Sequence, residues 1–94
     1  MNLELKNCEK FEQYLVDKCQ RHGGIQYKYE FENKFGASVI KHDFSYGHEE
    51  DLWELAVLHN GHLCSDTPIT DDVEGCLTDE AVAKLLQEIK DLEA

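Results

Sequence analysis

The sequence predicts a single α+β domain in the order α-β-β-β-β-α, with an antiparallel sheet and with N- and C-terminal helices packed on one of its faces. Apolar residues recur at steps of three and four near both ends of the chain, which is the period of a helix. Between the two ends they alternate at steps of two or form short runs, which is typical of strands. The chain has 94 residues, so residues 1–94 are expected to form one domain, because a second core would not fit.

The first helix is expected over residues 7–21. Asn7 would be its N-cap, and the Gly23-Gly24 pair would end it. Residues at helical spacing would give this helix one apolar stripe, formed by Cys8, Phe11, Leu15 and Cys19.

Four strands are expected between the helices, over residues 25–32, 37–42, 52–58 and 62–65. Residues 25–32 alternate aromatic or aliphatic side chains with polar ones, which predicts one buried face. Residues 52–58 are more continuously apolar, so they are expected to form a central strand that is buried on both faces. Asn60-Gly61 predicts a tight hairpin turn, because both of its positions require positive φ.

The last helix is expected to begin after Thr78, which would be its N-cap. Asp79 and Glu80 would lie in its first turn, where carboxylates suit the positive end of the helix. Residues 43–51 and 66–77 are expected to be polar loops. One face of the helix would be apolar, formed by Val82, Leu85, Leu86, Ile89 and Leu92.

Charge is distributed unevenly along the chain. Residues 1–42 hold six acidic and seven basic residues, and residues 43–94 hold fourteen and two, which gives the net charge of −11. The segment from His42 to Ala83 has no lysine or arginine. Such a segment repels nucleic acids and anionic membranes, and it attracts basic surfaces. We therefore expect a protein partner with a basic surface, no direct binding of nucleic acid and no membrane association.

The residues expected to contact this partner lie in the two acidic loops. Tyr46 is included because tyrosine and tryptophan often dominate interfaces, whereas Trp53 is expected to fill the core. The carboxylates expected to contact the partner are Glu49, Glu50, Asp51, Asp66, Asp71, Asp72 and Glu74.

A zinc site is the first chemical alternative. His59 and His62 would flank the hairpin turn, and two imidazoles with two thiolates would suit zinc. However, the chain has no Cys-x-x-Cys pair of the kind that structural zinc sites usually contain. We therefore expect no metal and no cofactor. The residues that come nearest to such a site are His59, His62, Cys64 and Cys76.

No catalytic signature is present. The sequence has no Gly-x-Ser-x-Gly elbow, no phosphate-binding glycine loop, no His-Glu-x-x-His pattern and no EF-hand loop. We therefore expect a protein that is not an enzyme. The first ten residues are polar, and no stretch is long and apolar enough for a membrane helix. These features predict a cytoplasmic protein with reduced cysteines.

Two blocks between Phe31 and Leu77 are distinctive, LWELAVL at 52–58 and DTPITDDV at 66–73. Shorter blocks are FEN at 31–33, GASV at 36–39 and SYG at 45–47. This stretch, about half of the chain, resembles a group of small bacteriophage-encoded proteins of uncharacterised role. The resemblance implies a phage or prophage origin and a place in the host bacterial cytoplasm. It implies no catalytic residue.

The expected function is therefore that of a phage accessory protein that binds a basic surface of a host protein. It would inhibit a host defence or nucleic-acid enzyme by presenting carboxylates in place of DNA phosphates, as a DNA mimic. Two alternatives remain open. One is a structural phage protein, a homodimer instead of a monomer, and the other is a small metal-binding protein.

Overall fold

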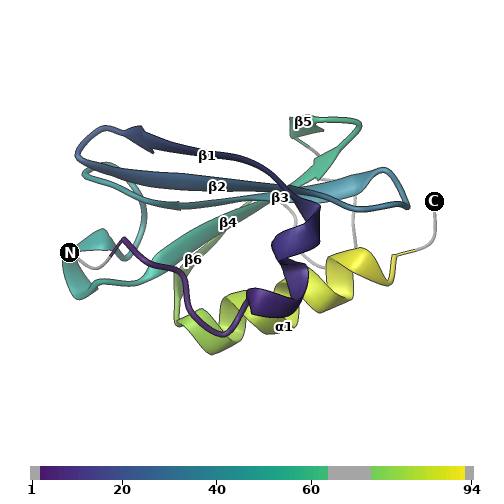
Figure 1. Cartoon of the computed structure of the whole chain (residues 1–94). Coiled ribbons are helices and arrows are strands. Elements are labelled where there is room, and N and C mark those ends of the chain that lie inside the picture. Colours follow the sequence, from purple (N-terminus) through teal and green to yellow (C-terminus); the bar gives the residue numbers. More distant parts are fainter. Residues whose placement is uncertain (1–2, 64–72, 93–94) are drawn as a thin grey trace.

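The structure is one antiparallel sheet with a long helix on one face (Figure 1). The computed structural model describes residues 3–63 and 73–92. Its elements in chain order are η1 (Glu9–Tyr14), β1 (Leu15–Arg21), β2 (Gly24–Glu30), β3 (Phe35–Lys41), η2 (His48–Glu50), β4 (Trp53–His59), β5 (His62–Leu63), β6 (Val73–Leu77) and α1 (Asp79–Lys90). The prediction of an α+β fold with an antiparallel sheet is confirmed.

The strands follow one another across the sheet in the order β1-β2-β3-β4. The free edge of β4 is then shared by two short strands. β5 pairs with its end at Leu58 and His59, whereas β6 pairs with its first half, where Trp53 lies opposite Leu77. β4 is therefore central along its length, as the apolar run predicted.

Burial in β2 and β4 follows the sequence pattern. Ile25, Tyr27 and Tyr29 of β2 are all buried and belong to the core. In β4, the alternate residues Trp53, Leu55 and Val57 enter the same core, while Ala56 and Leu58 are buried outside it. β4 is thus covered on both faces, as predicted.

The predicted N-terminal helix over residues 7–21 is wrong. Only Glu9–Tyr14 is helical, as a 3₁₀ helix, and Leu15–Arg21 is an edge strand that pairs with β2. Asn7 is not its N-cap, because the cap is Cys8 and it forms no side-chain cap hydrogen bond. One helix and a 3₁₀ turn, instead of two helices, lie on the core face of the sheet (Figure 1).

A two-residue turn explains this error. Arg21 lies opposite Gly24, so His22 and Gly23 form the turn between β1 and β2, with φ of 49° and 78°. Two successive positive φ angles are typical of type I′ hairpin turns. The Gly23-Gly24 pair therefore belongs to a hairpin, whereas it was predicted to end a helix.

The prediction of a loop over residues 66–77 is wrong in its last part, because Val73–Leu77 forms β6. The rest of that segment lies outside the described residues. The strand expected at 62–65 is present at His62–Leu63, and positions 64–65 are also outside the described part. Asn60 and Gly61 form the predicted turn, with φ of 53° and 83°.

The C-terminal helix α1 agrees with its prediction. Thr78 is the N-cap, and its Oγ1 accepts a hydrogen bond from the backbone N–H of Ala81 at 3.1 Å. The side chains Val82, Leu86 and Ile89 are fully buried against the sheet. From the turn between β2 and β3, Asn33 donates through Nδ2 to the carbonyls of Ile89, Lys90 and Leu92 at 2.8–3.0 Å and so fixes the other end.

Candidate functional site

The connection between β3 and β4, residues 42–52, is fixed to the hairpin turn of β1 and β2. The backbone N–H of Asp43 donates to the carbonyl of His22 at 3.0 Å. Ser45 is buried, its Oγ accepts from the N–H of His42, and its own N–H donates to the carbonyl of His42. The first half of this loop is therefore held by its own hydrogen bonds and not by side-chain packing alone.

The backbone of Tyr46 is held on both sides in the middle of the loop. Its N–H donates to Glu54 Oε1 at 3.0 Å, and its carbonyl accepts from the N–H of Cys76 on β6 at 3.4 Å. Gly47 follows with φ of 89°, and a Cβ there would lie 2.8 Å from the Cα of Cys76. Glycine is required here both by the left-handed backbone and by the close approach of β6.

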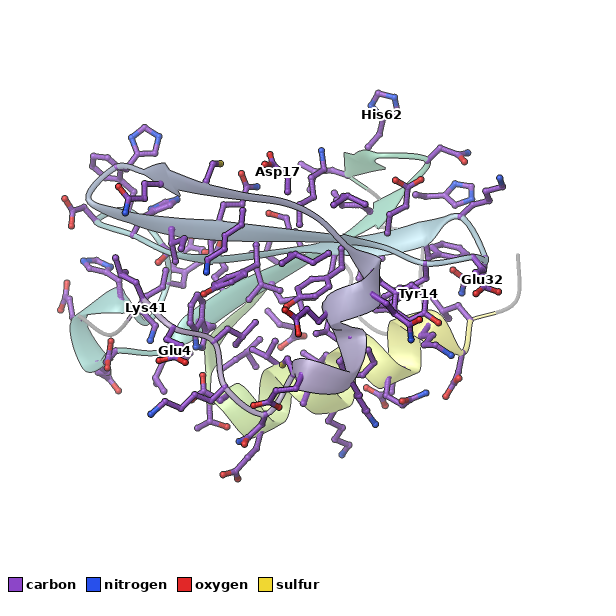
Figure 2. The ribbon with its side chains drawn as sticks, in the orientation of Figure 1. Glu4, Tyr14, Asp17, Glu32, Lys41 and His62 are labelled. Carbon is purple, nitrogen blue, oxygen red and sulfur yellow. The ribbon has the colours of Figure 1, made fainter. Side chains whose placement is uncertain are left out.

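A buried lysine lies beneath the second half of the loop. The Lys41 side chain is 2% exposed, and its Nζ is 3.1 Å from Asp51 Oδ1 and 4.3 Å from the centre of the Trp53 ring. Figure 2 shows Lys41 at the same end of the molecule as η2. Asp51 has φ of 63°, so its carboxylate reaches Lys41 from a left-handed backbone. Among the predicted contact residues, Asp51 is thus engaged within the protein.

Two large aromatic side chains of this loop are exposed. Phe44 is 76% exposed and Tyr46 is 67% exposed. Phe44 touches the His22 and His42 rings, with centroid distances of 5.4 and 6.2 Å. Phe44 was missed by the sequence analysis, although an apolar aromatic residue inside a polar, acidic loop was a signal that could have identified it.

A hollow of about 390 Å³ lies between this loop and β6. Carboxylates and aromatic side chains line it together, and Cys76 of β6 lines its other side. We call the side chains Asp43, Phe44, Tyr46, Glu49 and Glu50, which all line this hollow, the aromatic-acidic surface.

The charge of the aromatic-acidic surface is negative. Asp43, Glu49 and Glu50 are exposed, and Glu54 and Glu74 are half-buried on the neighbouring strands β4 and β6. The structure therefore brings together Tyr46, Glu49 and Glu50 of the predicted contact residues, with Glu74 on the adjoining strand. The predicted contacts Asp66, Asp71 and Asp72 lie outside the described residues.

His42 supports the position of Phe44. The backbone N–H of Phe44 donates to His42 Nδ1 at 3.1 Å, so this nitrogen must be unprotonated. Burial, followed by the neighbouring His22, lowers the pKa of His42 below its ordinary value of 6.5, against the opposing effects of Glu54 and Asp43. The neutral form of His42 is thus the one that holds the loop.

The structure separates the residues considered for zinc. His59 and His62 lie directly opposite each other across the turn of β4 and β5, and His62 points away from the sheet (Figure 2). Cys76 lies on β6 near Trp53, at the other end of β4, more than about 10 Å away at roughly 3.3 Å per residue. Cys64 lies outside the described residues. Within residues 3–63 and 73–92, no three His, Cys, Asp or Glu side chains form a metal-binding group.

The cysteines in the described part of the chain form no disulfide, and one of them is deeply buried. Cys8 is 4% exposed, and burial, with smaller effects of Asp79 and Glu9, raises the pKa of its thiol to about 12. A thiol of this kind stays protonated near neutral pH, and the thiolate is the nucleophile. Cys8 therefore acts as a small apolar core residue.

Comparison with protein-family models, with curated proteins and with solved structures found no match to this chain. None of the helices in the described parts of the chain combines the length and the apolar character needed to cross a membrane.

Proposed function

We propose that this chain is a non-enzymatic binding protein that uses the aromatic-acidic surface to bind a basic surface of another protein. In its full form, the proposal is a phage or prophage accessory protein of the host bacterial cytoplasm. Its target would be a host defence or nucleic-acid enzyme, whose DNA-binding groove it would occupy as a mimic of DNA.

One observation carries this proposal. Phe44 and Tyr46 are exposed around one hollow with Asp43, Glu49 and Glu50, on a loop whose backbone is fixed by hydrogen bonds. Large exposed aromatic side chains mark interaction sites more often than scattered surface residues do. The surrounding carboxylates give the sign of the charge that a partner must carry.

The charge also predicts how the association rate depends on salt. Clustered carboxylates create a negative potential that raises the rate of encounter with a positive surface, and salt screens this attraction. The complex is therefore expected to form quickly at low salt and to weaken as salt is added, mainly through the association rate.

Affinity capture with charge-reversal variants tests the proposal. Bacterial lysate is passed over the immobilised protein, and the affinity of each retained protein is measured between about 50 and 500 mM NaCl. We expect Glu49→Lys together with Glu50→Lys to weaken binding by roughly tenfold or more.

The matched control reverses two charges at the opposite end of the molecule. Glu30→Lys together with Glu32→Lys makes the same change in net charge, and Glu32 lies far from Lys41 and η2 (Figure 2). This control should keep most of the affinity. Equal losses in the two double variants, or an affinity that does not depend on salt, would contradict the proposal.

A further inference from the structure

We infer that the aromatic-acidic surface recognises an arginine side chain of its partner, with the guanidinium stacked on Phe44 and Tyr46 and paired with the carboxylates of Glu49 and Glu50. This inference rests on the proposed function, because it names the chemical group of the basic partner that enters the hollow.

The lining of the hollow suits an arginine side chain. Its volume of about 390 Å³ leaves room for such a side chain to enter. Two aromatic rings and three carboxylates line it, so a guanidinium can stack on Phe44 and Tyr46 while its N–H groups remain close to Glu49 and Glu50. A neutral or anionic group would leave these carboxylates without a counter-charge.

The aromatic side chains favour arginine over lysine. A guanidinium is planar and weakly hydrated, so it stacks on aromatic faces and gives up little hydration in doing so. It can also pair with a carboxylate through two parallel hydrogen bonds. The ammonium of lysine is compact and strongly hydrated, so it would gain the charge attraction but little of the stacking.

The rigidity of the loop supports recognition by stacking. Tyr46 is held by Glu54 and by the backbone of Cys76. Its Cβ also lies against Gly75, where an added Cβ would be only 2.6 Å from it. On the other side, the Phe44 ring contacts His22 and its N–H is held by His42. A site that is already ordered loses less conformational entropy on binding.

Two short peptides test the inference. One is a blocked peptide of alternating glycine and arginine, and the other replaces every arginine with lysine. We expect the arginine peptide to bind about threefold to tenfold more tightly in an NMR titration. The shifted amides should be those of the aromatic-acidic surface and of Cys76.

Substitution of the rings by leucine separates stacking from general apolar contact. Phe44→Leu and Tyr46→Leu keep an exposed apolar side chain and remove the ring, so we expect the preference for arginine to disappear while charge-driven binding of both peptides remains. Leu63→Ala is the control, because Leu63 is equally exposed at 76% and lies on β5. Gly75→Ala is a further variant that moves Tyr46 without removing its ring, and it should also weaken binding of the arginine peptide.

The outcomes distinguish this inference from the proposed function. If the two peptides bind equally to the natural protein, or if the leucine variants behave as Leu63→Ala does, the arginine inference is wrong. The proposed function would still stand in that case if Glu49→Lys with Glu50→Lys weakens binding of the captured protein as expected and the Glu30→Lys with Glu32→Lys control does not. Binding of the arginine peptide elsewhere, with no shift at Phe44 or Tyr46, would equally overturn the inference.

Discussion

Lys41 is buried at a place where an apolar residue would be expected. Its side chain is 2% exposed, it lies over Trp53, and Asp51 reaches it from the loop 42–52. A buried charge is unfavourable unless it is paired, because burial removes its hydration. The Lys41–Asp51 pair therefore couples the conformation of the candidate binding loop to the core, because Asp51 reaches the lysine only when the loop is in place.

Removal of the Asp51 carboxylate is predicted to destabilise the protein more than removal of the Lys41 ammonium. Asp51→Asn should lower the free energy of unfolding by roughly 1–3 kcal/mol, because it removes the Asp51 carboxylate from beside a buried ammonium. Asparagine also tolerates the left-handed backbone, so strain adds little. Lys41→Met should have a smaller effect, since methionine can pack on Trp53 without charge.

Urea unfolding of the two single variants and of the double variant measures this coupling. In the Lys41→Met background, Asp51→Asn should change the free energy of unfolding by less than about 0.5 kcal/mol. Additive losses would show that Asp51 acts on the loop independently of Lys41.

The protonation of His42 predicts a pH dependence of stability. Its pKa in the folded protein is below 6.5, whereas the unfolded chain binds the proton near 6.5. Between these two values the unfolded state holds more protons, so this contribution to stability is complete above pH 6.5 and is lost as the pH falls through the folded pKa. The hydrogen bond from Phe44 N–H is lost in the same step.

His42→Asn separates His42 from other titrating groups. An asparagine oxygen can accept from the N–H two residues ahead without carrying a proton of its own. Urea unfolding between pH 7.5 and about 5 should therefore show a shallower decline for this variant than for the natural protein. Identical pH profiles would exclude His42 as the source.

At the level of elements, the sequence predicted best where pattern and turn chemistry agreed. β2, β3 and β4 follow from alternation and from the apolar run, and α1 follows from its cap and its apolar face. β1 was missed because its apolar residues fit a helical spacing by chance. The pairing with β2 outweighs that local pattern, since strand preference depends on neighbours more than on the segment itself.

Part of the candidate site was also predictable from the sequence. The charge pattern along the chain pointed to Glu49 and Glu50 without any structure, because the absence of lysine and arginine can be read directly from the sequence. Tyr46 was included for its residue type, since tyrosine often dominates interfaces. The inward role of Asp51 was not predictable, since it depends on Lys41, which lies ten residues earlier and is brought beneath the loop by β3. The position of Phe44 in an acidic loop was a signal in the sequence, and the structure shows that its ring stays outside the core.

Two glycine variants test the corrected N-terminal hairpin. A Cβ at Gly24 would lie 1.9 Å from the carbonyl oxygen of Lys41, whereas a Cβ at Gly61 would meet no atom within 4 Å. Gly24→Ala should therefore destabilise by roughly 3 kcal/mol or more, because β2 and β3 would have to separate. Gly61→Ala should lose only about 1 kcal/mol, from the positive φ of that position.

Thermal unfolding of both variants decides between the two N-terminal structures. In the hairpin, Gly24→Ala must be much the more harmful substitution. At the end of a helix over residues 7–21, alanine at position 24 would be tolerated, so a melting temperature close to that of the natural protein would contradict the hairpin.

At the scale of the whole molecule, the net charge of −11 is concentrated in the second half of the chain. The molecule is 35 Å long and 21 Å across its shortest axis. At 0.1 M salt the Debye length is about 10 Å, so charges at opposite ends barely interact, while neighbouring carboxylates such as Glu49 and Glu50 still repel. Repulsion between neighbouring carboxylates of the aromatic-acidic surface therefore opposes folding more than repulsion between distant charges does.

Salt is accordingly predicted to stabilise the protein. The melting temperature should rise as NaCl is added from about 20 to 500 mM, because screening weakens the repulsion between like charges. Glu49→Gln together with Glu50→Gln should raise the melting temperature at low salt and reduce its dependence on NaCl, whereas Glu30→Gln with Glu32→Gln should change that dependence less. A melting temperature that stays constant or falls with NaCl would mean that the carboxylates do not act as one surface, and the electrostatic basis of partner binding would be lost with it.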